Sequence, residues 1–150
     1  MMRKTARAII IKDNKILLMY RNKFGEEYYS LIGGAIEVNE TPEEALFREV
    51  KEETTLIINS PKLVIIEDAG SMFGIQYIYL CQYVSGEPQL DQNSMEFKIT
   101  KDGKNIYKPL WLDVNLLSGV NLLPVELKDT LLDNLNNGFP DDVLNIKINS

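Results

Sequence analysis

The order of the predicted elements indicates an α+β fold, in which helices pack on a mixed β-sheet. Short apolar segments typical of strands come first, a capped amphipathic helix interrupts them, and further strands and a second helix follow. The length of 150 residues suits one domain, which we expect to span residues 1–150. Hydrophobic residues make up 45% of the chain and charged residues 25%, so a core can form without disulfides.

The first part of the chain is predicted to form a β-hairpin followed by a third strand. Three consecutive isoleucines mark the first strand, and a second apolar segment follows a pair of residues that tolerate positive φ. The strands are predicted over residues 5–12, 15–20 and 28–32, with Asp13-Asn14 as the hairpin turn and a polar loop over 22–27. The third strand leads directly into the glycine pair at 33 and 34.

The central helix has the clearest start signal in the sequence. Thr41 suits the N-cap, Pro42 suits the first helical position, and Glu44 completes a capping box. We expect this helix to end near Thr54, and residues 59–61, which include a proline, to separate it from the next strand. Further strands are predicted over residues 62–68, 75–84 and 107–113.

The remaining segments are more polar. Residues 86–105 are predicted to be a loop with little regular structure, long enough to be functional. Residues 114–118 suit one helical turn. Pro124 begins a second amphipathic helix with leucines four residues apart, and Asn137-Gly138 ends it. The tail over 141–150 has room for a short edge strand.

Composition excludes several kinds of chemistry. The formal net charge of −6 argues against a nucleic-acid polymer as partner, whereas a small polyanion remains compatible if a divalent metal neutralises it. The chain contains no histidine, which excludes a histidine general base, a Ser-His-Asp triad and His-ligated zinc. Cys81 is the only cysteine, so neither a disulfide framework nor a thiolate zinc site is expected.

The sequence also lacks a recognisable membrane or export signal. Its basic start is followed by an apolar run that charged residues soon interrupt, and this pattern does not fit a signal peptide. No apolar stretch approaches the roughly 20 residues of a membrane span. We therefore expect a cytoplasmic protein without a membrane partner.

Glutamates gather on one side of the central helix. At about 100° per residue, Glu53 and Glu52 lie about 40° and 60° from Glu49, on opposite sides of it. The stripe borders the apolar face, and like charges spaced i,i+4 destabilise a helix by about 0.2–0.5 kcal/mol. Two interpretations remain open: a solvated acidic surface, or a site for a hard cation such as Mg²⁺ or Mn²⁺, which prefers oxygen ligands. Arg48 lies i,i+4 from Glu52 and can orient that carboxylate.

Residues 34–56 resemble the Nudix box, Gly-x5-Glu-x7-Arg-Glu-U-x-Glu-Glu-x-Gly-U, where U is a bulky aliphatic residue. The matching positions are Gly34, Glu40, Arg48, Glu49, Val50, Glu52, Glu53 and Leu56. The signature glycine is replaced by Thr55, which should resist the left-handed conformation that glycine allows. We therefore expect a changed exit from the helix. Because this exit lies away from the carboxylates, we expect activity to survive.

The resemblance implies an α/β/α sandwich and an enzyme that hydrolyses the diphosphate linkage of a nucleoside diphosphate derivative, with Mg²⁺ or Mn²⁺ as cofactor. Nucleoside triphosphates, ADP-ribose and sugar nucleotides all belong to this class. By position, Glu49, Glu52 and Glu53 would be metal ligands, together with the Gly34 carbonyl, while Arg48 would hold the carboxylates in place. Water would attack phosphorus, and a carboxylate would take its proton. Glu49 is the first candidate for this base and Glu52 the second.

Residues outside the box complete the predicted site. In similar enzymes a glutamate from a downstream loop joins the metal, and here Glu96 is best placed, with Glu87 second; a solvated loop residue is the alternative for Glu96. Arg21, Gly33 and Gly34 are candidates for contact with the substrate, although a solvated loop would also explain Arg21.

Two other functions share this fold. One is a catalytically weak nucleotide-binding or regulatory module, against which the intact set of box carboxylates argues. The other is an isoprenoid diphosphate isomerase, which expects histidines that this chain lacks. The sequence leaves the oligomeric state open, a homodimer included.

Overall fold

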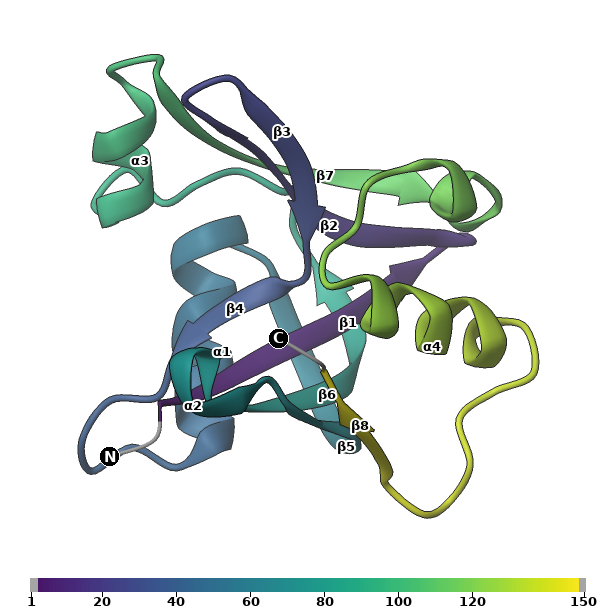
Figure 1. Cartoon of the computed structure of the whole chain (residues 1–150). Coiled ribbons are helices and arrows are strands. Elements are labelled where there is room, and N and C mark those ends of the chain that lie inside the picture. The colour runs from purple at the N-terminus through teal and green to yellow at the C-terminus, as the bar shows by residue number, and fades with distance from the viewer. Residues whose placement is uncertain (1–2, 149–150) are drawn as a thin grey trace.

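A computed structural model describes residues 3–148, and their side chains except those of residues 72 and 73. It contains one mixed sheet of eight strands with helices packed against it (Figure 1). The strands are β1 (Lys4–Lys12), β2 (Lys15–Lys23), β3 (Glu26–Ser30), β4 (Ile32–Ala35), β5 (Ile57–Asp68), β6 (Ile75–Ser85), β7 (Asn105–Asp113) and β8 (Leu144–Lys147). The predicted α+β fold with a mixed sheet is confirmed.

Strand β1 is the centre of the sheet. It pairs in parallel with β6 along most of its length, and antiparallel with β4 over its first half. Beyond Ala8 its partner changes, and Ile11 and Lys12 pair with the start of β2 in the predicted hairpin. Strand β2 pairs with β7 along its whole length and with β3 from Met19 onward, while β4 pairs with β1 beside the main order of the sheet.

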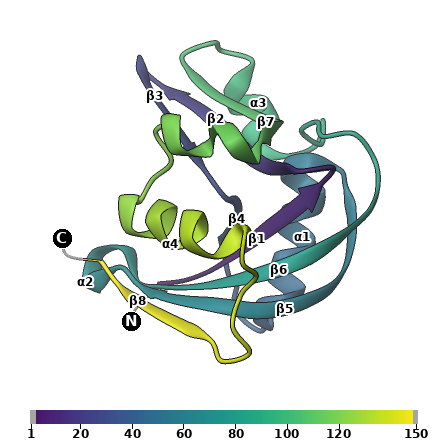
Figure 2. The same ribbon diagram turned by 90° about the vertical axis from the view of Figure 1, so that its right-hand side faces the viewer.

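Side chains alternate along β1 between two hydrophobic cores. Ala6, Ala8 and Ile10 pack in a core with helix α1 (Pro42–Thr54), whereas Ile9 packs in a second core with helix α4 (Val125–Leu135). Successive strand residues point to opposite faces, so the two helices cover opposite sides of the sheet. Figure 2 shows this arrangement, with the strands between α1 and α4.

Helix α1 begins as the sequence predicts. The Thr41 Oγ1 accepts the Glu44 N–H at 3.1 Å, and the Glu44 carboxylate accepts the Thr41 N–H at 2.9 Å. This capping box satisfies two donors of the first turn. The apolar face formed by Ala45, Leu46 and Val50 is buried against the sheet. The start and the rotation of α1 are therefore both fixed by local sequence.

The remaining elements are short. They are helix α2 (Gly70–Phe73), helix α3 (Met95–Thr100) and a 3-10 helix, η1 (Val114–Gly119). Strand β8 pairs in parallel with β5 at the edge of the sheet, so the predicted tail does contain an edge strand; residues 149 and 150 lie outside the described residues. Within residues 3–148, no helix is both long and apolar enough to cross a membrane.

Several local expectations from the sequence are wrong. Most of the predicted loop over 22–27 is strand, because β2 extends to Lys23 and β3 begins at Glu26. The segment 86–105 is not irregular throughout, because Ser94 caps helix α3 with its Oγ. Strand β5 begins at Ile57 rather than at 62, and it tolerates the break at 59–61 through shifts in its register with β6. The predicted strand over 28–32 is divided between β3 and β4, which have different partners.

The exit of α1 also differs from the expectation. Thr55 adopts the left-handed conformation, with φ 59° and ψ 6°, and its N–H donates to the Lys51 carbonyl at 2.9 Å. The chain thus leaves the helix as it would with glycine. The next residue, Leu56, is buried, and the Thr54 carbonyl accepts the Gln89 N–H at 3.0 Å. These tertiary contacts fix the exit against the conformational preference of threonine.

Candidate active site

Two glycines let the helix approach the sheet at the candidate site. Gly33 has φ 149°, and a Cβ there would lie 2.1 Å from the carbonyl oxygen of Ala6. A Cβ on Gly34 would lie 2.6 Å from the carboxyl group of Glu49. Neither position can take a side chain without displacing its neighbour. Gly34 therefore leaves the space that the Glu49 carboxylate fills, and Gly33 allows the close approach of β4 to β1.

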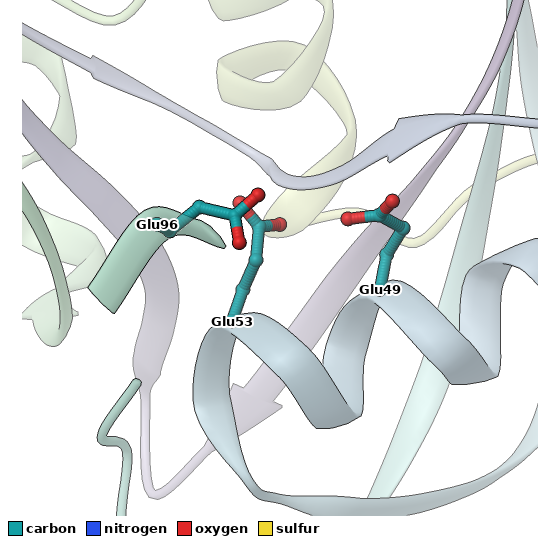
Figure 3. A group of neighbouring side chains, drawn as sticks. All are labelled: Glu49, Glu53 and Glu96. Carbon is teal, nitrogen blue, oxygen red and sulfur yellow. The ribbon is translucent and has the colours of Figure 1, made fainter. Parts of the chain in front are cut away.

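Three carboxylates converge beside this pair. One oxygen from each of Glu49, Glu53 and Glu96 lies within 4.8 Å of the other two. Figure 3 shows Glu49 and Glu53 projecting from α1, while Glu96 reaches them from α3. Only 8% of Glu49 and 5% of Glu53 is exposed. We call Glu49, Glu53 and Glu96 the carboxylate cluster.

Backbone contacts bring Glu96 into the cluster. The Gln89 N–H donates to the Thr54 carbonyl, and the Asp91 N–H donates to the Glu52 carbonyl at 2.9 Å. These bonds tie the segment before α3 to the last turn of α1, whose carbonyls have no partner within the helix. At the other end of α3, the Thr100 Oγ1 accepts the N–H of Tyr107 in β7. Helix α3 is thus held over the carboxylate face of α1.

Burial makes the cluster costly to ionise in the absence of a cation. It raises the pKa of Glu53 to about 8, although the Gly33 N–H donates to Glu53 Oε1 at 2.8 Å and Arg7 lies nearby. Burial also raises the pKa of Glu49, against the opposing effect of Arg48. Neighbouring carboxylates raise the pKa of both residues further, because like charges at short distance disfavour each other's ionisation.

The donor set fits a hard divalent cation. The Oε2 atom of Glu96 is buried and has no hydrogen-bond partner among the described residues. A buried carboxylate oxygen without a donor is unfavourable unless a cation or water satisfies it. Converging carboxylate oxygens are the ligands that Mg²⁺ and Mn²⁺ prefer. The structure brings Glu49 and Glu53 together with the downstream Glu96, and their role as metal ligands stays a prediction.

Arg48 is held mainly by a residue that the helix geometry did not suggest. Its Nε and Nη2 donate to the two oxygens of Glu40 at 2.7 and 3.0 Å, which is a bidentate pair. Its Nη1 donates to Glu49 Oε1 at 2.7 Å and lies 3.5 Å from Glu52. This pairing with Arg48 lowers the pKa of Glu40 to about 2 and raises that of Arg48. Arg48 thus orients Glu49 directly and Glu52 only loosely.

Glu52 lies apart from the carboxylate cluster. Its side chain is 38% exposed, and it is not among the oxygens that meet within 4.8 Å. Burial nevertheless raises its pKa, with further contributions from Glu96 and Glu37. The structure therefore brings together two of the three predicted helix ligands with Glu96 and places Glu52 at the edge. Glu87, the second downstream candidate, is exposed on its loop and does not join them.

A cavity of about 340 Å³ adjoins the cluster, and arginines line it together with the glutamates. Its lining includes Gly33, Gly34, Glu49, Glu53, Glu96, Arg3, Arg7, Arg21, Tyr28 and Tyr107. Arginines in the same lining as a cation site suit a phosphorylated ligand, because guanidinium groups bind phosphate oxygens. A larger cavity of about 650 Å³ lies beyond Tyr107, with Thr55 and Phe97 in its lining, and contains no member of the cluster.

Arg21 lines the cavity of about 340 Å³, and most of its N–H donors already bind groups of the protein. Its Nε donates to the Ile106 carbonyl, Nη1 to the Tyr28 hydroxyl, and Nη2 to Asn105 Oδ1. Its guanidinium also stacks on the ring of Tyr107, 3.6 Å from the centroid. Arg21 thus joins β2 to β3 and β7 on the wall of the cavity, and a substrate contact through it remains a prediction.

Comparison with known proteins identifies the family. The model of the NUDIX domain matches residues 1–123, which is most of the chain. The chain therefore belongs to the Nudix family, as the box over 34–56 indicates.

Individual relatives share shorter segments with it. An ADP-ribose pyrophosphatase of Methanocaldococcus jannaschii is 56% identical over 50 residues, which are 33% of this chain and 30% of that protein. An NAD-capped RNA hydrolase, NudC, of Photorhabdus laumondii is 31% identical over 86 residues, 57% of this chain and 34% of that protein. The matched segments thus span only about a third of the curated relatives.

A solved structure agrees over the whole fold. That of an ADP-ribose pyrophosphatase from Streptococcus suis superposes with a TM-score of 0.66 at 20% identity, and the match covers 99% of this chain and all of that one. At this identity the likeness concerns the fold alone.

Sequence reasoning missed two features of the site. It gave Arg7 no role, because a lone arginine on a strand carries no local signal. It also matched Glu40 only as a signature position, although the Arg48–Glu40 pair forms across the turn before α1. The only signal in the sequence for this pair is that Glu40 and Arg48, which carry opposite charges, are both fixed positions of the box.

Proposed function

We propose that this protein is a metal-dependent hydrolase that cleaves the diphosphate linkage of a nucleoside diphosphate derivative. The observation that supports this most strongly is the carboxylate cluster of Glu49, Glu53 and Glu96, which shares one cavity lining with arginines. In this proposal the cluster and the Gly34 carbonyl hold Mg²⁺ or Mn²⁺. The ion would supply charge neutralisation and Lewis acidity at the diphosphate.

The chain's own residues would have distinct tasks. Arg48 fixes the carboxylate of Glu49 while anchored to Glu40, so Glu49 is presented in one orientation. Glu52 is more exposed than the cluster and lies close to it, which suits a group that exchanges protons with water. We therefore propose Glu49 or Glu52 as the base that takes the proton from the attacking water.

ADP-ribose is the first substrate to test, because the name of the Methanocaldococcus relative states that activity. The experiment is a panel of ADP-ribose, nucleoside triphosphates, sugar nucleotides and dinucleoside polyphosphates, with Mg²⁺ and Mn²⁺ varied. Release of a nucleoside monophosphate that depends on the metal is the expected result. Tight binding of one compound without hydrolysis of any would favour a nucleotide-binding module instead.

Glu53→Gln is the matched inactive variant for this panel. It keeps the size of the side chain but removes a carboxylate from the cluster, so turnover should fall by far more than tenfold. Turnover within about tenfold of wild type, a difference of roughly 1.4 kcal/mol in the barrier, would contradict the assignment of Glu53 as a metal ligand. Circular dichroism and thermal unfolding would show whether the variant is folded.

A further inference from the structure

Arg7 is anchored beside the glycine pair by three hydrogen bonds. Its Nε donates to Gln76 Oε1 at 3.0 Å, and its Nη1 donates to the carbonyls of Leu31 and Gly33 at 3.1 and 3.2 Å. In the antiparallel pairing of β1 with β4, Arg7 lies directly opposite Gly33. Because Gly33 has no side chain, the guanidinium can lie against the β4 backbone.

One end of this guanidinium is left unused. Nη2 makes no hydrogen bond to any residue within 3–148, and Arg7 is one of the residues that line the cavity. The same cavity lining contains Glu49, Glu53 and Glu96. A fixed cation with a free donor, beside a site for a metal ion, matches the way that arginine binds phosphate oxygens.

Arg7 differs in this respect from the other arginine that is fixed in the cavity. All three guanidinium nitrogens of Arg21 donate to groups of the protein, whereas Arg7 retains Nη2. Arg7 is also tied to the cluster through Gly33, whose carbonyl accepts from Arg7 Nη1 and whose N–H donates to Glu53 Oε1. Among the fixed arginines, Arg7 thus has the donor that a substrate needs.

We propose that Arg7 is a substrate-binding residue that donates through Nη2 to a non-bridging phosphate oxygen of the diphosphate. The assignment rests on the proposed function, because it requires a diphosphate in this cavity. The ligand class is a phosphoric anhydride with a metal ion on one side and Arg7 on the other. Gln76 and the Leu31 and Gly33 carbonyls serve to hold the guanidinium in place.

The test must separate this role from a purely structural one. Arg7 lies near Glu67, a buried carboxylate without hydrogen bonds among the described residues, so Arg7→Gln alone would leave that charge uncompensated. The variant of choice is therefore the double substitution Arg7→Gln/Glu67→Gln. Glu67→Gln alone is its matched background, and Lys12→Gln removes a cation from the same strand outside the cavity.

Three quantities are measured for each variant: the Kd of α,β-methylene-ADP with Mg²⁺ present, the Kd of the metal alone, and KM and kcat for the substrate that the wild type cleaves. We expect the double substitution to raise the nucleotide Kd and KM at least tenfold over Glu67→Gln, as loss of a charged hydrogen bond predicts. The metal Kd should not rise, because loss of a neighbouring positive charge does not weaken the binding of a cation to Glu49 and Glu53. Lys12→Gln should match the wild type.

Two outcomes would overturn the role of Arg7 while leaving the proposed function intact. In the first, the wild type is active and the double variant binds the nucleotide as tightly as Glu67→Gln. In the second, the metal Kd rises and the nucleotide Kd does not, which would mean that Arg7 only supports the turn that positions Glu53. A wild type that neither binds nor cleaves any diphosphate would instead overturn the proposed function, and this assignment with it.

Discussion

The acidic residues of the candidate site are held where ionisation is unfavourable. Glu49 and Glu53 are buried by the packing of α1 on the sheet, and Glu96 is added from a different element. Apolar burial and mutual repulsion oppose their charges, while the Gly33 N–H and Arg48 favour them. Such an arrangement destabilises the protein on its own and becomes favourable when a cation enters. A role in binding a cation therefore explains the burial of these carboxylates better than a contribution to stability does.

Glu96 should set the metal requirement of the enzyme. We predict that Glu96→Gln raises the Mg²⁺ concentration for half-maximal activity at least tenfold, because a neutral amide replaces one carboxylate of the cluster. Activity measured against Mg²⁺ concentration checks this. Glu87→Gln is the control, since Glu87 is exposed on the loop before α3 and lies outside the cluster. Equal metal requirements for the two variants would remove Glu96 from the site.

Glu67 offers a residue-scale prediction about stability. It lies on β5, fully buried, and neither carboxylate oxygen has a hydrogen-bond partner among the described residues. Burial raises its pKa to about 7, from 4.5, against the opposing effect of Arg7. The folded state therefore binds this proton more tightly than the unfolded state does. The contribution of Glu67 to stability falls as the pH rises from about 4.5 to 7 and stays low above that.

Glu67→Gln removes this dependence, since glutamine does not ionise. Relative to wild type, the variant should gain roughly 2 kcal/mol in free energy of unfolding between pH 5.5 and pH 8.5. Urea unfolding of both proteins at the two pH values measures the double difference, in which other titrating groups cancel. A difference that does not change with pH would show that Glu67 ionises in the fold as easily as in water.

At the scale of elements, α1 combines a conventional start with an unusual end. The capping box at Thr41 and Glu44 follows the local sequence, whereas Thr55 occupies a left-handed position where a β-branched residue is disfavoured. Its hydroxyl makes only a long contact, 3.4 Å to the Glu87 carbonyl. The conformation of Thr55 is therefore imposed by its surroundings and carries strain.

Thr55→Gly should relieve that strain. We predict that it raises the free energy of unfolding by roughly 0.5–1 kcal/mol, the cost of the left-handed threonine being larger than the added entropy of the unfolded glycine. Chemical denaturation provides the measurement. Lys51→Gly, on the exposed face of the same helix, is the matched control and should lower stability by about 1 kcal/mol. Destabilisation by both substitutions would show that Thr55 is not strained.

The elements that could be predicted from sequence are those with local signals. The hairpin of β1 and β2, the start of α1 and the glutamate stripe all follow from turn residues, capping and helical periodicity. Helix α3 could not be predicted, because it has six residues and depends on bonds from Gln89 and Asp91 to the last turn of α1. The start of β5 could not be predicted because residues 59–61, which include a proline, indicate the end of an element. In the structure β5 continues through them by shifting its register with β6.

The same distinction holds for the site. Glu49 and Glu53 share one helix, so their proximity follows from periodicity, whereas the position of Glu96 depends on contacts between distant segments. Arg7 reaches the cavity through the pairing of β1 with β4, which no local pattern indicates. Periodicity also placed Glu52 in the stripe, but its side chain is partly exposed and lies outside the cluster. That the chain is one domain stays a prediction.

At the scale of the whole molecule, a metal ion should act as a stabilising ligand. The folded protein assembles Glu49, Glu53 and Glu96 into one cluster, and an unfolded chain of net charge −6 has no such site. Binding to the folded state alone raises stability by RT ln(1 + [L]/Kd), about 2.7 kcal/mol at a hundred times the Kd. For a chain of this size that corresponds to a rise in Tm of about 5–10 °C.

Thermal unfolding against Mg²⁺ or Mn²⁺ concentration tests this without any substrate. The Tm of the wild type should rise with the logarithm of the metal concentration, and choline chloride at matched ionic strength should have little effect, because general screening does not replace coordination. At a pH above about 8, where Glu53 is ionised, Glu53→Gln should begin from a higher Tm without metal, since it lacks the buried charge, and should respond weakly to metal. A higher starting Tm together with a weaker response to metal would distinguish loss of a binding site from damage to the core. A variant that lost stability without metal, or whose Tm rose with metal as much as that of the wild type, would place the cation elsewhere.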